Sequence, residues 1–381
     1  MAEKYSPLKI NQELAASLRA IQRATVRDEA ARLTLGKLLQ CALQLEFATI
    51  PTYLSAAFSL KPTNIKIYDL IFRAAIEEML HMTAVANLMN AIGIAPDIAA
   101  AVPEYPHDLT TLDPPLRLNL CSFSLELVEK LFMKIEAPEQ RVQFFTEAAA
   151  RRPETIGQFY AQIIGIIERG TIPGLFENAK RDKYKQIQVR PNFKEIAYAS
   201  NQDNEKYPLK PYLDFMIEDP DSAVRHLSWV VDQGEGEDVY QPLTAEGIPG
   251  HHYRFESILR KRYLIKDKSA EKGYSFSGGD LPFDPDGVYD FETNAKTKNY
   301  IGPVREEMQF FNENYTQMIN LLQRAFNCPS PEQEQQSKAA AESAIDNMRS
   351  MQGLATAIVG SAQSSGIKAG IPFEYARSPT S

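Results

Sequence analysis

The stretch Ala75-Ile76-Glu77-Glu78-Met79-Leu80-His81-Met82 places two carboxylates and an imidazole inside an apolar segment of the chain. Counting in steps of four and three through Glu78 and His81 gives a stripe that is otherwise apolar, made of Ile67, Ile71, Ala74, Val85, Leu88 and Ile92. Such a stripe is one face of a helix, predicted here over about 67–92. Glu78 and His81 therefore face the core, whereas Glu77 lies off the stripe and is expected to point outward.

A buried carboxylate and imidazole need neutralisation, hydrogen bonds or a metal ion. The preceding segment, about 28–60, is also predicted to be a helix, and Pro51 is expected to kink it or end its regular part. Glu46 is the single charge on a face of this helix that includes Leu35, Leu39, Ala42, Thr49 and Tyr53. A Glu on one helix and a Glu-x-x-His on the next form half the ligand set of a helical carboxylate metal centre. The alternative is a salt-bridged Glu–His network without a metal.

The other half of such a centre has to come from later helices. His252 and Glu256 stand at i and i+4 in "GHHYRFESI" and share one helix face, while His251 is expected to point outward. A third helix is expected at about 153–169. The candidates for its ligand are Glu154, Gln158 and Glu168, and no central Glu is apparent.

The composition excludes several classes of protein. A chain of 381 residues with 44% hydrophobic and 24% charged residues fits a globular protein, and its net charge of −8 argues against a nucleic-acid partner. Three widely spaced cysteines give no disulfide framework or zinc motif, which fits a reducing compartment. No apolar signal core or long apolar run is present, so we expect a cytoplasmic protein with no membrane partner.

Helical periodicity organises the remaining chain. Further helices are expected at about 121–136, 140–150, 221–232, 250–263, 304–326 and 333–362, and irregular insertions at about 97–120, 171–219 and 266–303. No clear β-strand run or glycine-rich phosphate loop is visible. We therefore divide the chain into an N-terminal extension (1–24), a metal-binding helical domain (25–303), a C-terminal helical hairpin packed on it (304–365) and an irregular tail (366–381).

Six motifs occur in one order along the chain: "LQLEFATIPTYLSAAFSLK", "EEMLHMTAVANLMNAIG", "TIGQFYAQI", "VVDQGEG", "HHYRFESI" and "YSFSGGDLPF". Together they resemble the ferritin-like domain family related to iminophenyl-pyruvate dimer synthase, found in violacein- and rebeccamycin-type pathways, over about residues 25–330. The resemblance implies an all-α fold, namely a ferritin-like four-helix bundle with long irregular insertions and a C-terminal helical hairpin. Known large members carry further sequence and couple two arylpyruvate imines oxidatively, whereas this chain resembles the ferritin-like unit alone.

The resemblance also implies a metal centre. Glu46, Glu78 and His81 match the family's Glu and Glu-x-x-His positions, and His252 and Glu256 match its His-containing segment in reversed order. Because Gln158 stands where a carboxylate is usual, both one and two metal ions remain open. Carboxylate and imidazole ligands suit iron, and manganese or zinc is compatible with them.

The first functional hypothesis is an iron-dependent oxidoreductase that acts with O2 on a small amino-acid-derived or keto-acid substrate in specialised metabolism. Tyr53 is then a hydrogen-bond donor to the site or a redox-active group, with an ordinary core tyrosine as the alternative. Arg254 is expected to recognise a substrate carboxylate. The alternatives are an iron-oxidising or storage protein, whose subunits are shorter, and a non-catalytic bundle with a buried polar network. A homodimer is compatible with each hypothesis.

Overall fold

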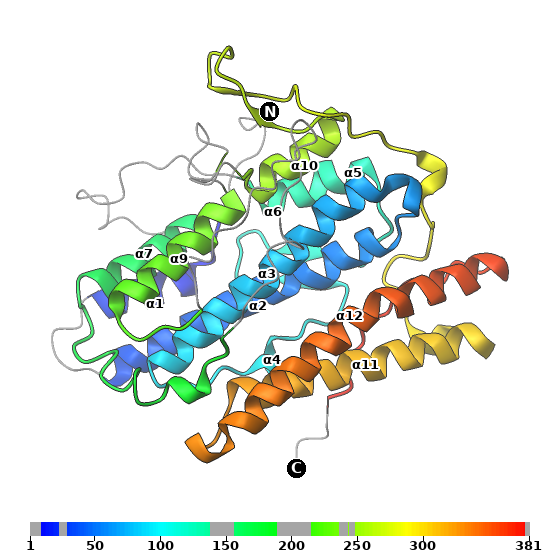
Figure 1. Cartoon of the computed structure of the whole chain (residues 1–381). Coiled ribbons are helices and arrows are strands. Elements are labelled where there is room, and N and C mark those ends of the chain that lie inside the picture. Colours follow the sequence, from blue (N-terminus) through cyan, green and yellow to red (C-terminus); the bar gives the residue numbers. More distant parts are fainter. Residues whose placement is uncertain are drawn as a thin grey trace.

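The computed structural model describes residues 9–22, 29–137, 156–188, 215–235, 243 and 248–377. Two long helices, α2 (Glu29–Phe58) and α3 (Ile65–Ala91), run antiparallel through its middle and are joined by the 3-10 turn η2 (Pro62–Asn64) (Figure 1). Every residue of α2 from Leu45 to Phe58 is buried. The helix continues through Pro51 to Phe58, so this proline does not end it, and the alternative expectation of a kink stays a prediction. Packing of the buried helix offsets the backbone hydrogen bond that proline removes.

The other two layers of the bundle are each divided into two pieces. The first consists of a continuous helical segment, made of α5 (Leu125–Leu127), the π-helical turn η3 (Val128–Phe132) and α6 (Met133–Ile135), and then of α7 (Ile156–Glu168). The second consists of α9 (Pro220–Glu235) and α10 (His251–Arg260). In Figure 1, α7 and α9 lie beside one half of the α2–α3 pair, and α5, α6 and α10 lie beside the other half.

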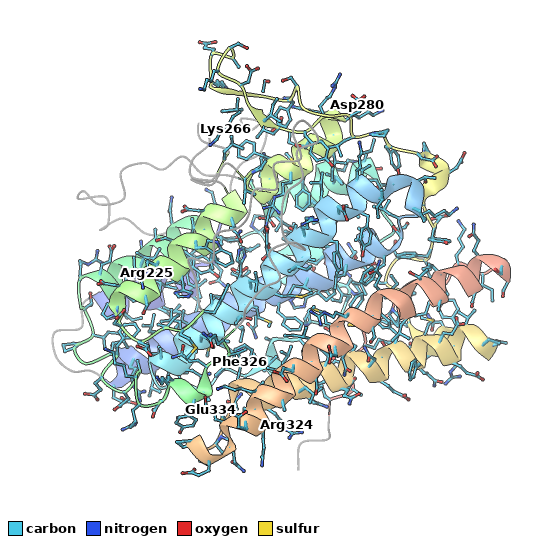
Figure 2. The ribbon with its side chains drawn as sticks, viewed as in Figure 1. Arg225, Lys266, Asp280, Arg324, Phe326 and Glu334 are labelled. Carbon is cyan, nitrogen blue, oxygen red and sulfur yellow. The ribbon has the colours of Figure 1, made fainter. Side chains whose placement is uncertain are left out.

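The C-terminal helices α11 (Gly302–Phe326) and α12 (Glu334–Ser364) pack along each other as a hairpin beside the bundle. The hairpin meets α3 at Phe326, the last residue of α11, which is fully buried (Figure 2). The amide of Asn90, near the end of α3, donates a 2.8 Å hydrogen bond to the carbonyl of Phe326. This bond ties the hairpin to the central helices.

Short elements fill the connections. They are α1 (Gln12–Gln22), which packs on α2 and α7, and α4 (Ile98–Ala101), with 3-10 turns η5 (Lys183–Lys185), η6 (Pro285–Gly287), η7 (Thr297–Asn299) and η8 (Pro331–Gln333). Two small antiparallel pairs, which the sequence did not reveal, join β1 (His107–Leu109) to β2 (Leu116–Leu118) and β3 (Ile265–Lys266) to β4 (Tyr274–Ser275).

One continuous apolar core links the central helices, the divided layers and α11 with α12. The all-α prediction is thus confirmed, and the predicted helix at 140–150 lies outside the described residues. The proposed domain boundaries stay a prediction. Among the helices of the described ranges, none is both long and apolar enough to span a membrane.

Candidate metal centre

Two groups of acidic and histidine side chains meet in the core, halfway along α2 and α3. Glu46 of α2 joins Glu78 and His81 of α3 in the first group, and Glu78, Glu136 and His251 form the second. Within each group one ligand atom from every residue lies within 4.8 Å of the others, and all of these residues are buried. Glu78 belongs to both groups.

The two carboxylate oxygens of Glu78 face different imidazoles. Its Oε2 lies 3.2 Å from Nδ1 of His81, and its Oε1 lies 3.0 Å from Nδ1 of His251. Nδ1 of His81 is also 3.4 Å from Oε2 of Glu46, and Nδ1 of His251 is 3.6 Å from Oε1 of Glu136. A carboxylate that gives one oxygen to each group has the arrangement of a bridging ligand.

The fold delivers the two groups differently. Glu46, Glu78 and His81 stand inside long helices, where positions three apart converge on one point. Glu136 instead directly follows the last residue of α6, and His251 is the first residue of α10. The site thus consists of residues from the middle of α2 and α3 together with one residue from the end of α6 and one from the start of α10.

Both imidazoles form a hydrogen bond through Nε2, the ring nitrogen that points away from the two ligand groups. Nε2 of His81 lies 3.1 Å from Oε1 of Gln233 in α9, and Nε2 of His251 lies 2.7 Å from Oε2 of Glu77. Because these partners accept a hydrogen bond, Nε2 carries a proton and Nδ1 is turned toward the carboxylates. Nδ1 of His251 has no hydrogen-bond partner of its own.

Arg254 and Glu77 form a buried ion pair next to His251. Nη1 of Arg254 is 2.8 Å from Oε2 of Glu77, and its Nε donates to the carbonyl of Pro249 at 2.8 Å. Glu77 has no exposed surface, so the expectation that it points outward is wrong. The reason is that α3 is covered on more than one face. The structure pairs Arg254 with Glu77 and does not place it in the wall of the cavity described below, and its predicted contact with a substrate stays a prediction.

Two tyrosines hold the outer carboxylates. Tyr53 donates its hydroxyl hydrogen to Oε1 of Glu136, and Tyr160 of α7 donates to Oε1 of Glu46. The ring of Tyr53 is fully buried and packs against the ring of Phe132, at 4.8 Å between centroids, and against the ring of Phe255 in α10. Tyr53 is thus a hydrogen-bond donor to this site, as one of the alternatives predicted, and its hydroxyl group fixes the position of the Glu136 carboxylate.

Burial and the charges of neighbouring side chains determine which groups of the metal-free site are protonated. Burial and the neighbouring Glu136 raise the pKa of Glu78 to about 7, although His81 opposes this. Burial disfavours the charged form of His81, yet the carboxylates of Glu78 and Glu46 raise its pKa to about 10. Burial likewise disfavours the charged form of Glu77, but Arg254 and His251 lower its pKa to about 2. Protons thus balance the carboxylates, and a bound cation can replace them.

A cavity of about 80 Å³ borders the first group. Its wall includes Glu46, Glu78, His81 and Glu136, and most of the remaining wall is aliphatic, with Leu45, Ile135, Ile156, Val230 and Val231. His251 and Glu77 are not part of this wall. The cavity therefore reaches every member of the first group, and of the second group it reaches Glu78 and Glu136 but not His251.

His252 and Glu256, which the sequence predicted as ligands, join neither of the two groups. Oε1 of Glu256 accepts a 2.7 Å hydrogen bond from Nε of Arg260, and the ring of His252 packs edge-on against Tyr253. Burial lowers the pKa of His252 to about 4. All residues from 251 to 258 are buried, so periodicity could not select the face that meets the site. His251, which was expected to point outward, stands in the second group instead.

Glu136 was missed by the sequence reasoning. Glu136 stands four residues after Phe132 and eight after Val128, which are both fully buried, but the π-helical turn Val128–Phe132 shifts the phase, so α-helical periodicity does not mark it. The earlier candidates for this ligand came from the next helix. There Gln158 is half-buried and Glu168 is exposed, while Glu154 lies outside the described residues.

Comparison with known proteins agrees with this architecture. The family model described as Ferritin-like matches residues 39–260, a range that contains all five members of the two groups. A solved structure of a ferritin-like protein from Caulobacter vibrioides is similar to this chain, with 21% identity and a TM-score of 0.52. The match covers 90% of this chain and 97% of that chain and shows a common fold. No curated protein matches the sequence.

Proposed function

This chain belongs to the ferritin-like family, and from that premise we propose that it is a non-haem iron oxidoreductase whose centre holds two metal ions bridged by Glu78. The observation that carries the proposal is the division of the Glu78 oxygens between two ligand groups. Three carboxylates and two imidazoles are a donor set that suits iron, and manganese or zinc would also accept it.

The residues present fit such a metal centre. Three carboxylates lie together in the core, where an uncompensated negative charge is costly. Both imidazoles turn Nδ1 toward the carboxylates and are fixed from behind, as metal-ligating histidines are. Nδ1 of His251 lies 3.0 Å from Oε1 of Glu78 without the alignment of a hydrogen bond. Burial disfavours the charged form of this imidazole, yet the surrounding carboxylates raise its pKa, so a metal ion can take the place of its proton.

Bound iron would supply electron transfer to O2, a chemistry that amino-acid side chains do not offer. The residues of the chain then have three tasks. Tyr53 and Tyr160 hold protons on their hydroxyl oxygens and direct the carboxylates of Glu136 and Glu46. The aliphatic part of the cavity wall offers contact to an apolar substrate group.

The substrate class that we propose is a small amino-acid-derived or keto acid, oxidised with O2. It rests on the resemblance of the six ordered motifs to the family of iminophenyl-pyruvate dimer synthase. The aliphatic cavity wall is compatible with the apolar part of such a molecule. Arg254 does not line the cavity and is given no substrate contact in this proposal.

The test is to load the metal-free protein with Fe(II) under anaerobic conditions and then admit O2. We expect two iron ions per chain, one for each ligand group, and O2 consumption that is lost in Glu46→Ala. Glu256→Gln, a change at a buried glutamate outside both groups, serves as the matched control and is expected to behave as the wild type.

Other outcomes would favour the alternatives. Iron uptake that continues far beyond two ions per chain, together with a very large assembly, would favour an iron-oxidising or storage protein. A purified protein that takes up no stoichiometric metal would favour a non-catalytic bundle in which the carboxylates and histidines form only a polar network.

A further inference from the structure

The two histidines of the centre differ in the group that holds them from behind. Nε2 of His251 meets the carboxylate of Glu77 at 2.7 Å, whereas Nε2 of His81 meets the neutral amide oxygen of Gln233 at 3.1 Å. A hydrogen bond to a carboxylate is shorter and stronger than one to an amide. It also raises the basicity of the other ring nitrogen, which is the metal ligand. The His251 side therefore offers the better imidazole donor.

Arg254 neutralises the buried Glu77 carboxylate that accepts the hydrogen bond from His251. Its Nη1 pairs with Glu77 at 2.8 Å, so the buried carboxylate is not left as an unpaired charge. The guanidinium is itself fixed by a 2.8 Å hydrogen bond from Nε to the carbonyl of Pro249, immediately before α10. Glu77 is thus held in one place and holds His251 in turn.

Access to the two ligand groups also differs. The cavity wall contains all three members of the first group, whereas of the second group it contains Glu78 and Glu136 but not His251, which has no exposed surface. An ion held by Glu136 and His251 is therefore enclosed on its His251 side, and an ion held by Glu46 and His81 faces the space in which O2 or a substrate would bind.

We infer that the two metal positions are unequal and that Glu77 is the positioning residue that makes them so. The position formed by Glu78, Glu136 and His251 fills first and retains its ion, while the position formed by Glu46, Glu78 and His81 is the weaker one that faces the cavity. This inference rests on the proposed two-metal centre and adds an order of filling to it.

The test is a titration of the metal-free full-length protein with Co(II), followed by the visible absorption of the bound ion. The wild type should bind in two steps. Glu136→Ala should remove the tighter step and Glu46→Ala the weaker one, which assigns each step to its group. Glu77→Gln should weaken the tighter step by about 10- to 100-fold, the usual effect of losing such a partner.

The reciprocal change is Gln233→Glu, which gives His81 a carboxylate partner and should tighten the weaker step by about tenfold. A role in folding alone would not make Gln233→Glu bind the metal ion more tightly. This variant therefore tests the inference even if Glu77→Gln fails to fold. Glu256→Gln is the matched buried control and should leave both steps unchanged. Two equal steps in the wild type, or no gain in Gln233→Glu, would overturn the inference but leave the metal centre standing. A wild type that binds no Co(II) would instead refute the proposed function.

Discussion

Removal of Glu78 should abolish both metal positions at once, whereas removal of Glu46 or Glu136 should abolish only one. The prediction follows from the carboxylate oxygens of Glu78, one at 3.2 Å from Nδ1 of His81 and the other at 3.0 Å from Nδ1 of His251. Glu78→Ala leaves two ligands in each group, and Glu46→Ala leaves the second group complete.

The expected size of the effect comes from the linkage between binding and folding. An ion supplied at a hundred times its dissociation constant stabilises the folded state by about 2.7 kcal/mol for each occupied position. With the ion at a hundred times the dissociation constant of the weaker position, the wild type should therefore gain at least about 5 kcal/mol in its free energy of unfolding. Glu136→Ala keeps only the weaker position and should gain about 2.7 kcal/mol, whereas Glu46→Ala keeps the tighter position and should gain more. Glu78→Ala should gain almost nothing.

Urea denaturation with and without Co(II) measures this gain, and metal analysis of the gel-filtered protein gives the ions bound per chain. The metal-free variants supply their own baselines, so a loss of stability caused by the substitution itself does not enter the difference. The reasoning would be refuted if Glu78→Ala kept half of the wild-type gain, because Glu78 would then serve one position only.

Three further predictions concern the same core. Tyr53→Phe removes the donor to Glu136 and should lower the unfolding free energy of the metal-free protein by about 1–3 kcal/mol in urea denaturation. The pKa of Glu77 is lowered to about 2, so its ionised form stabilises the fold above the ordinary pKa of 4.5 and this contribution is lost as the pH falls toward 2. The stability difference between the wild type and Glu77→Gln should accordingly shrink below pH 4.5, and a constant difference across urea denaturations at several pH values would contradict the pairing with Arg254. A chelator should lower the thermal midpoint of the metal-loaded wild type but not that of Glu78→Ala, and calorimetry would show whether it does.

The part of the site that the sequence revealed is the part built on uninterrupted helices. The central helix α3 continues for 27 residues, so its stripe carries a clear phase and places Glu78 and His81 inward. Glu46 is readable on α2 for the same reason. The prediction failed for Glu77 because the stripe assumes a single buried face, and α3 buries residues on other faces as well.

The part that stayed hidden lies where the other two layers are divided. His251 is the first residue of α10, and all residues from 251 to 258 are buried. Because this stretch has no exposed polar face, hydrophobic periodicity does not distinguish His251 from His252. Glu136 follows a short helical segment that contains a π-helical turn, which shifts the phase of the side chains. The pairing of Arg254 with Glu77 joins residues far apart in the chain, and only the tertiary structure brings them together.

The central claim is that Glu78 bridges two metal positions, and anomalous scattering at the iron edge from crystals of the iron-loaded protein tests it most directly. The account predicts two peaks beside Glu78, one next to Glu46 and His81 and the other next to Glu136 and His251. A single peak on one side of Glu78, or no peak in the bundle core of iron-loaded crystals, would contradict it.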